Sequence, residues 1–301
     1  MVKMAENITA SMVKELREKS GAAMMDCKKA LVETAGDFEK AFEWLRQKGA
    51  ATAGKKASRA TSEGVVLGRT SSDGKKACLI ELNCETDFVA RNEEFVAFAN
   101  KVADAAIANS ADDPEALLKV TVDGKTIQEL ITEAIAKTGE NIVIKRVKCF
   151  ELKGNGIIGL YVHTLGGKMG ALVELSASSE VKGDGQAFAR ELAMHIVSSK
   201  PEYLTKEQIP VEIVENEKRI ESGKADLAGK KDEIRDKIVT GRVEKNLAER
   251  CLVLQPFVKD PGQTVDAVLK AKGKELGTDL VPSQFAIFIL GAGEEDKSEE
   301  E

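Results

Sequence analysis

Residues capable of acid, base or nucleophilic chemistry are sparse in this chain. His163 and His195 are its two histidines, too few for a typical histidine-based metal cluster, and they suggest no catalytic triad. The five cysteines, which form no Cys-x-x-Cys pair, are Cys27, Cys78, Cys84, Cys149 and Cys251. Their spacing indicates neither a disulfide framework nor a zinc site, so we expect reduced, mostly packed thiols. We therefore expect no enzyme chemistry, no metal site and no cofactor in this chain.

One glycine-rich run has the spacing of a nucleotide-binding motif. Gly154-Asn155-Gly156-Ile157-Ile158-Gly159 matches the dinucleotide fingerprint, and Glu174 lies at a suitable distance beyond it. That fingerprint must open a helix whose N-terminus receives the phosphates, whereas this run continues into the strand-like segment IIGLYVHT. The context therefore argues against nucleotide binding at this turn.

The most informative segment is CETDFVARNEEF, which runs from Cys84 to Phe95. Upstream of it lies an apolar run of strand length, ACLIEL, and downstream Asn92 can cap a helix. Asp87 and Phe88 thus fall on the connection, where an exposed aromatic ring can enter a pocket of a partner. The alternative is that Phe88 folds back onto the core.

Two further groups of side chains are candidates for partner contact. Met24-Met25-Asp26-Cys27-Lys28-Lys29 combines adaptable thioethers with cations at the start of a helix, although core filling is an alternative for one methionine. His163, near the tip of an expected hairpin, is a candidate exposed contact. His195 falls in the middle of an amphipathic helix, so we expect it to be packed.

Composition and charge describe an ordinary soluble protein. With 43% hydrophobic and 31% charged residues, the chain can bury the cores of about two domains plus appendages. No apolar run approaches the roughly 20 residues of a membrane span and no secretory signal is evident, so we expect no membrane association and a cytoplasmic location. Residues 294–301 contribute −5 to the net charge of −6. Residues 1–60 are only mildly basic, which favours an acidic protein partner, or simply a solvated helical surface, over nucleic acid.

The first part of the chain is expected to be a small helical head. One helix begins at Thr9 or Ser11 and ends at Gly21, a second runs from Met24 to near Gly36, and Asp37 caps a third that carries Trp44 and ends at Gly49. The segment from Ala50 to Ser62 has a linker-like composition. We place the head at residues 5–56 and the linker at residues 57–62; a unit of this size usually serves as a binding module.

A diverged internal repeat follows the linker. Gly64 to Glu85 and Gly156 to Ser178 both have the pattern of strand, glycine hairpin and strand, and each leads to an amphipathic helix. Asp73-Gly74 and Gly166-Gly167 supply the turn residues. The sequence therefore predicts an α+β fold with a duplicated core and antiparallel sheets, the first half at residues 63–152 and the second at residues 153–290.

A highly charged segment at residues 205–250 interrupts the second half. Its sparse apolar residues form two narrow seams, Val211, Val214 and Ile220 in the first and Ile234, Ile238, Val243 and Leu247 in the second. We interpret it as an antiparallel two-helix arm. The chain then returns through a helix and a strand, and residues 291–301 are expected to be a disordered acidic tail.

Four separated motifs closely resemble the translation elongation factor Ts family. They are SGAAMMDCKKAL (Ser20 to Leu31), CETDFVARNEEF (Cys84 to Phe95), SKPEYL (Ser199 to Leu204) and QPFVKDP (Gln255 to Pro261), and they occur in the family's order. The resemblance extends over essentially residues 5–290. It implies a UBA-like (ubiquitin-associated-like) helical head, a duplicated core and an inserted coiled-coil hairpin, in agreement with the patterns above.

The resemblance also implies a function and its residues. The family acts as guanine-nucleotide exchange factor for elongation factor Tu: it binds the GDP form, displaces Mg²⁺ and promotes GDP release so that GTP can bind. Thr86, Asp87, Phe88 and Val89 match the segment that dislodges Mg²⁺ from the partner. Met24, Met25, Lys28 and Lys56 match partner-binding positions of the head, and His163 matches one of the core. Nucleotide and Mg²⁺ belong to the partner, and no direct contact with nucleic acid or membrane is implied.

Two departures from the family and two rival functions remain open. The last strand gives way to LGAGEEDKSEEE in place of the additional C-terminal helix that often docks on the partner, and the arm has its own sequence. The rivals are a non-catalytic adaptor that binds proteins through the helical head, and an enzyme built on the Gly154 turn.

Overall fold

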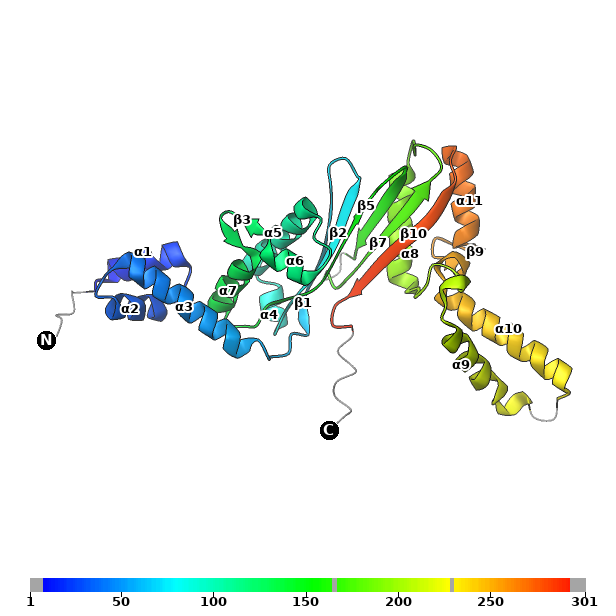
Figure 1. Ribbon diagram of the computed structural model, residues 1–301, viewed down its shortest axis with the longest axis horizontal. Helices are drawn as coiled ribbons and strands as arrows, with labels where there is room; N and C mark the ends of the chain where they lie inside the picture. Colours follow the sequence, from blue (N-terminus) through cyan, green and yellow to red (C-terminus); the bar gives the residue numbers. More distant parts are fainter. Residues whose placement is uncertain (1–7, 164–166, 228–229, 293–301) are drawn as a thin grey trace. The chain divides into compact units, whose positions relative to one another are not determined.

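The computed structural model describes residues 8–163, 167–227 and 230–292 (Figure 1). The first three residues of the expected head, the hairpin residue Gly166 and the tail beyond residue 292 lie outside the described residues. Within the described part, helices combine with antiparallel sheets, so the predicted mixture of α and β structure is confirmed. Two compact units are present, one formed by described residues of Met1–Leu67, Ile80–Lys148 and Ile289–Glu301 and the other by those of Gly68–Leu79 and Cys149–Phe288.

The head consists of three helices, α1 (Ala10–Ser20), α2 (Met24–Glu33) and α3 (Phe38–Lys56). Local capping sets three of the six boundaries: the Thr9 and Asp37 side chains accept backbone N–H groups of α1 and α3, and Gly21 ends α1 in the left-handed conformation. A small core joins the three helices; its buried residues are Val13, Leu16, Cys27, Ala30, Leu31 and Ala41.

The predicted end of α3 at Gly49 is wrong, because the helix continues to Lys56. An interior glycine costs only about 1 kcal/mol relative to alanine, and the alanines after it are the best helix formers. Gly49 is buried and faces α7 (Ile127–Thr138), where a Cβ at this position would lie 3.6 Å from the Ala136 Cβ. Packing against α7 thus favours a helical conformation in a segment whose composition alone indicates a linker.

The first sheet has the strand order β1-β2-β5. Its strands are β1 (Glu63–Thr70), β2 (Lys76–Cys84) and β5 (Val143–Glu151). The elements between β2 and β5 are α4 (Asp87–Ala90), α5 (Glu93–Asn109), α6 (Pro114–Lys119), the short hairpin β3 (Thr121–Val122) and β4 (Lys125–Thr126), and α7. A capping box formed by Thr126 and Glu129 begins α7.

The second sheet has the strand order β10-β7-β6. Its strands are β6 (Gly156–Val162), β7 (Met169–Ala177) and β10 (Leu280–Ile289), and the helices α8 (Gly185–Ser199) and α11 (Val265–Leu276) precede β10. Gly159 on β6 is required by close approach, because a Cβ there would lie 2.0 Å from the Ala189 carbonyl oxygen of α8.

Both halves of the core repeat the same order of elements. In each half a hairpin leads to a long helix, a second helix follows, and the last strand pairs with the second strand of the hairpin. This agreement supports the internal repeat read from the sequence.

The insertion in the second half is a helical hairpin formed by α9 (Val211–Ser222) and α10 (Asp232–Arg250). Short 3₁₀ turns flank it at Lys206–Gln208 and Leu252–Leu254, and a third, Ala225–Leu227, lies between the two helices. The hairpin β8 (Pro256–Phe257) and β9 (Asp260–Thr264) then leads to α11. The predicted seams are only partly right. Val243 and Leu247 are buried, but the side chains of Val211, Ile220 and Ile234 are exposed.

In the arm a charged side chain is buried, whereas those three apolar side chains are not. Glu221 is buried, and its carboxylate accepts hydrogen bonds from Lys224 Nζ at 2.6 Å and from Asn246 Nδ2 at 3.2 Å. The hydrogen bond from Asn246 joins the two helices, so polar as well as apolar contacts hold the arm.

Candidate partner-binding site

The aromatic side chain that the sequence placed on a connection is exposed. Phe88 belongs to α4, a helix of four residues between β2 and α5, and its side chain is 84% exposed. Thr86 begins this helix by accepting the Val89 backbone N–H at its Oγ1, at 3.4 Å. The alternative that Phe88 folds back onto the core is therefore wrong. We call residues Thr86–Val89 the Phe88 turn.

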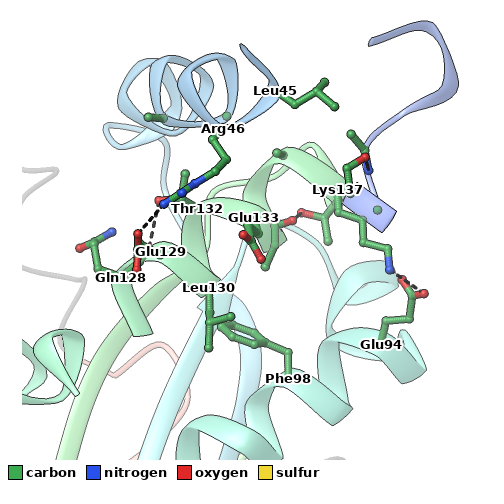
Figure 2. Close-up of a pocket in the computed structure, with 18 of the residues that line it drawn as sticks. Leu45, Arg46, Glu94, Phe98, Gln128, Glu129, Leu130, Thr132, Glu133 and Lys137 are labelled. Atoms are coloured by element: carbon green, nitrogen blue, oxygen red, sulfur yellow. Dashed lines mark hydrogen bonds and ion pairs between the residues drawn. The ribbon is translucent and has the colours of Figure 1, made fainter. Parts of the chain in front are cut away.

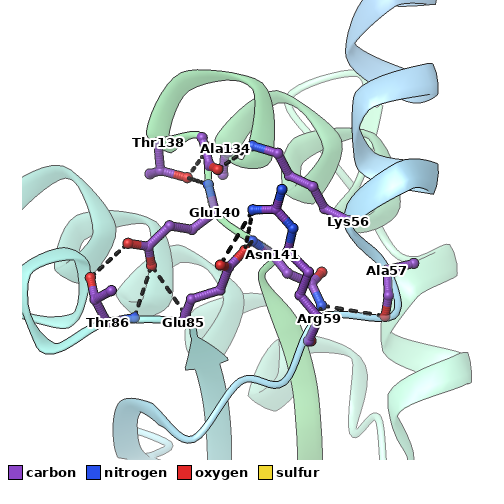
Figure 3. A network of polar contacts seen from close by, with 10 residues as sticks. Lys56, Ala57, Arg59, Glu85, Thr86, Ala134, Thr138, Glu140 and Asn141 are labelled. Carbon is purple, nitrogen blue, oxygen red and sulfur yellow. Dashed lines mark hydrogen bonds and ion pairs between the residues drawn. The ribbon is translucent and has the colours of Figure 1, made fainter.

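The segment that follows α7 forms hydrogen bonds to the start of the Phe88 turn (Figure 3). The Glu140 carboxylate accepts hydrogen bonds from the Glu85 N–H at 3.1 Å, the Thr86 N–H at 3.0 Å and the Thr86 hydroxyl at 2.6 Å. In the opposite direction, the Asn141 N–H donates to Glu85 Oε1 at 2.7 Å. The backbone that carries Phe88 is thus fixed at its start, while the ring itself projects into solvent.

Cys84 lies at the base of this turn and is buried. Its thiol donates to the Thr86 carbonyl oxygen at 3.2 Å. Burial, with a smaller contribution from the negative charge of Glu140, raises the pKa of the Cys84 thiol to about 12. The thiol is therefore neutral and serves packing and hydrogen bonding, not nucleophilic chemistry.

In the head, one face of α2 presents the predicted contact residues to solvent. Met25 is 72% exposed and Met24 is 52% exposed, and Lys28 is also exposed. Val32, one further turn along the same helix, is 54% exposed although sequence reasoning did not single it out. The opposite face, with Cys27, fills the core of the head. Neither methionine is needed for core filling, and the exposed set has the spacing of a helix face.

The side chains of Lys56 and His163 are half-buried and hydrogen-bonded. Lys56 is half-buried at the end of α3, and its amine donates to the Gly139 carbonyl oxygen, next to Glu140. His163 is half-buried after β6, with Nδ1 at 2.9 Å from the Tyr161 hydroxyl. Through the Gly139 carbonyl oxygen, Lys56 is connected to the segment that holds the Phe88 turn.

An open cavity of about 970 Å³ lies between α3, α5 and α7 (Figure 2). Leu45, Phe98 and Leu130 contribute apolar surface to it. At its edges Arg46 of α3 pairs with Glu129 of α7, and Lys137 of α7 pairs with Glu94 of α5, each at 2.7 Å. The ion pairs connect the head helix α3 with α7 and α7 with α5, and they engage four charged groups that line the cavity.

Other kinds of functional site find no support in the described residues. Across residues 8–163, 167–227 and 230–292, no group of three or more His, Cys, Asp or Glu side chains is arranged to hold a metal ion. The Gly154 turn leads into the strand β6, so the helix that a dinucleotide site requires does not follow it. Among the helices that the structure describes, none combines the length and apolarity needed to cross a bilayer.

Sequence reasoning missed the residues that hold the Phe88 turn. Glu140 and Asn141 lie 54 to 56 residues from the groups they bind, so no local periodicity or cap connects them with Thr86. The available local signal was Gly139, which ends α7 in the left-handed conformation and thereby turns the chain toward β2.

Comparison with known proteins identifies the family. The family model described as "Elongation factor TS" matches residues 85–292. An elongation factor Ts from Clostridium perfringens (strain SM101 / Type A) is 45% identical over 295 residues, covering 97% of this chain and 96% of the relative. Those from Azoarcus sp. (strain BH72) and Nostoc sp. (strain PCC 7120) are 47% and 45% identical, covering 98% and 96% of this chain and 94% of each relative. The chain belongs to the elongation factor Ts family, which confirms the resemblance drawn from its motifs.

Proposed function

We propose that this chain is a guanine-nucleotide exchange factor for elongation factor Tu. It binds the GDP-bound partner in the cytoplasm, displaces Mg²⁺ with the Phe88 turn and promotes GDP release so that GTP can bind. The observation that carries this proposal is the 84% exposed ring of Phe88 on an anchored helical turn, in a chain of the elongation factor Ts family. The chain itself forms and breaks no covalent bond in this mechanism.

The residues of the turn have separate roles in the proposal. Phe88 enters the partner near its Mg²⁺ and displaces the groups that hold the ion. Thr86 caps the helix, and Asp87 lies in its first turn, where a negative charge stabilises the helix N-terminus. Val89 supplies the N–H that completes the cap. An acid beside the ring also faces a metal-binding region of the partner, where it competes with the partner's own ligands.

The remaining contacts hold the turn against the partner. Met24, Met25 and Lys28 form a docking face on α2, as expected of a UBA-like binding module. Lys56 is tied to Gly139 through its amine, so its contact with the partner uses the aliphatic part of the side chain. His163 contacts a second region of the partner, and α9 and α10 form the coiled-coil hairpin of the family.

Several contacts are needed because exchange is energetically demanding. A ~10⁴-fold acceleration of GDP release requires roughly 5.5 kcal/mol, at about 1.36 kcal/mol per decade. Burying one phenylalanine side chain contributes about 1.5 to 3 kcal/mol. Since coupling between sites is reciprocal, bound nucleotide must weaken the binding of this chain by as much as the chain weakens nucleotide. The contacts of the α2 face and of the core supply the rest of the roughly 5.5 kcal/mol.

Stopped-flow release of a fluorescent GDP from elongation factor Tu tests the proposal, with excess unlabelled nucleotide present. The wild-type chain should accelerate release strongly, and Phe88→Ala should reduce the acceleration by about 10- to 150-fold, which is the burial energy expressed as a rate ratio. Val281→Ala, which truncates another exposed side chain on β10, should keep the wild-type rate.

The same experiment separates the proposal from an adaptor function and tests the role of Phe88. Binding without acceleration by the wild-type chain would support an adaptor in place of an exchange factor. Full acceleration by a folded Phe88→Ala variant would retain exchange but assign it to other residues.

A further inference from the structure

The segment Gly139–Asn141, which connects α7 to β5, contacts the start of the Phe88 turn (Figure 3). Its course is determined by α7. The Gly139 N–H donates to the Ile135 carbonyl oxygen at 2.9 Å with Gly139 in the left-handed conformation, and the Glu140 N–H donates to Thr138 Oγ1 at 3.2 Å. Glu140 is thereby fixed to the end of a 12-residue helix. The backbone of Glu140 is therefore held by contacts with α7 that do not involve the Phe88 turn.

One carboxylate satisfies three donors at the start of the turn. Glu140 Oε2 accepts both the Glu85 and the Thr86 N–H groups, and Oε1 accepts the Thr86 hydroxyl. Because the hydroxyl donates its proton to Glu140, its oxygen is directed to accept the Val89 N–H and cap α4. Hydrogen bonds to an ionised acceptor are shorter and stronger than neutral ones, as the 2.6 Å O–H···O distance reflects.

A second set of bonds closes the arrangement from the other side. Asn141, which is buried, donates its backbone N–H to Glu85 Oε1 and its side-chain amide to the Arg59 carbonyl oxygen at 3.0 Å. Residues 85 and 86 thus exchange hydrogen bonds with residues 140 and 141. We call this exchange the Glu140 clasp.

The second half of the core contains an equivalent clasp with different chemistry. There Gly277 ends α11 in the left-handed conformation, and Thr278 Oγ1 accepts the Ser179 N–H at 3.0 Å on the connection between β7 and α8. The Asp279 N–H in turn donates to Ser178 Oγ at 3.0 Å. This connection, SSEVKGD, has no aromatic residue. The half that presents an exposed ring therefore has a carboxylate at the position where the other half has a neutral hydroxyl.

We propose that Glu140 is a positioning residue for Phe88, holding the Thr86 cap so that the ring is presented to the partner in one direction. The ring is 84% exposed, so its own packing does little to orient it. The helix that bears it has four residues, far fewer than a helix needs to be stable alone. Through the clasp, α7 holds the Phe88 turn in place while the ring displaces the partner's ligands. This inference rests on the proposed exchange function.

Glu140→Gln tests the inference because it keeps the side-chain shape but replaces one acceptor oxygen with a donor. In the GDP-release assay we expect the maximal rate at saturating protein to fall about 10-fold, comparable with the loss of one or two charge-assisted hydrogen bonds. The concentration that gives half-maximal rate should change less than about threefold, because the docking face on α2 is intact. The control Glu133→Gln removes a carboxylate of α7 that pairs with Lys125, and it should behave as wild type.

The double variant Phe88→Ala/Glu140→Gln distinguishes positioning from general destabilisation. If Glu140 acts through Phe88, the double variant should release GDP within about twofold of Phe88→Ala alone, since the two changes act on one interaction. A further 10-fold loss in the double variant would overturn the proposal.

Hydrogen exchange of the free chain provides a readout that does not involve the partner. Glu140→Gln should speed exchange of the Thr86 and Val89 amides by about 10-fold or more, while amides of α1 and α10 keep their wild-type rates. Unchanged exchange at these two amides would refute the clasp even if GDP release were slowed. Faster exchange together with no acceleration of GDP release by the wild-type chain would instead refute the exchange function and, with it, the role of the clasp in exchange.

Discussion

Lowering the pH should destabilise this protein through one buried histidine. His195 on α8 is fully buried, and the Val258 N–H donates to its Nδ1 at 3.2 Å. Its Nε2 therefore carries the proton and donates to Gln255 Oε1 at 3.0 Å. The Gln255 amide is held in that orientation because its Nε2 donates to the carbonyl oxygens of Ser199 and Glu249. Protonation of Nδ1 would bury a charge and remove the acceptor of the Val258 N–H.

Burial accordingly lowers the pKa of His195 below its ordinary value of 6.5, and the hydrogen bond that His195 donates to Gln255 opposes this only in part. The unfolded chain thus binds the proton first as the pH falls. The stability contributed by the neutral imidazole is fully present above pH 6.5 and is lost as the pH falls through 6.5 toward the folded pKa. For an imidazole that stays neutral when folded, lowering the pH from about 7.5 to about 5.5 costs up to about 1.4 kcal/mol.

Urea unfolding followed by far-UV circular dichroism measures this contribution. The free energy of unfolding of the wild-type chain and of His195→Gln should be compared at both pH values. The variant is expected to be less stable at pH 7.5 but to lose about 1 kcal/mol less than the wild type on acidification. An equal loss in both chains would show that His195 is not the group that takes up the proton on unfolding.

Two further expectations concern packing and thiol reactivity. Gly159→Ala should lower the free energy of unfolding by about 3 kcal/mol, because the new Cβ would meet the backbone of α8. The control Gly154→Ala should change this free energy little, because nothing lies within 4 Å of its Cβ. Equal effects of the two substitutions in urea unfolding would contradict the close approach of β6 and α8. Cys84 is buried and its thiol pKa is raised, so it should resist iodoacetamide at pH 8 in the native chain, while the half-buried Cys149 reacts first. Mass mapping of the labelled chain measures both rates. Labelling of Cys84 as fast as Cys149 would argue against the packing of the Phe88 turn.

The sequence predicted those features that depend on neighbours in the chain. Thr9, Asp37 and Asn92 begin helices as expected, since a side chain that caps an N-terminus acts within three residues of its own position. The strands on either side of the two predicted turns were recognised from contiguous apolar runs, and Gly74 has the positive φ expected of it. The family followed from short motifs that are each contiguous in the chain.

The features that escaped prediction depend on distant parts of the chain. Gly49 marks a helix end by propensity, yet α3 continues because its far end packs on α7. Ile234 fits a helical seam by spacing, but it is exposed while a buried Glu221 interacts with Asn246 of the facing helix. The exposure of Phe88 could not be decided either, because the hydrogen bonds that hold the start of its turn come from Glu140, which is remote in sequence.

The separation between Thr86 and Glu140 also has a consequence for the order in which parts of the protein fold. The clasp closes a loop of 54 residues, and such long-range contacts form only after the entropy of loop closure has been met. During synthesis, the Phe88 turn leaves the ribosome before α7 and Glu140 exist. The nascent chain can therefore fold its helical head, whose core is local, well before the clasp can form. The orientation that we propose for Phe88 is thus acquired after the head has folded.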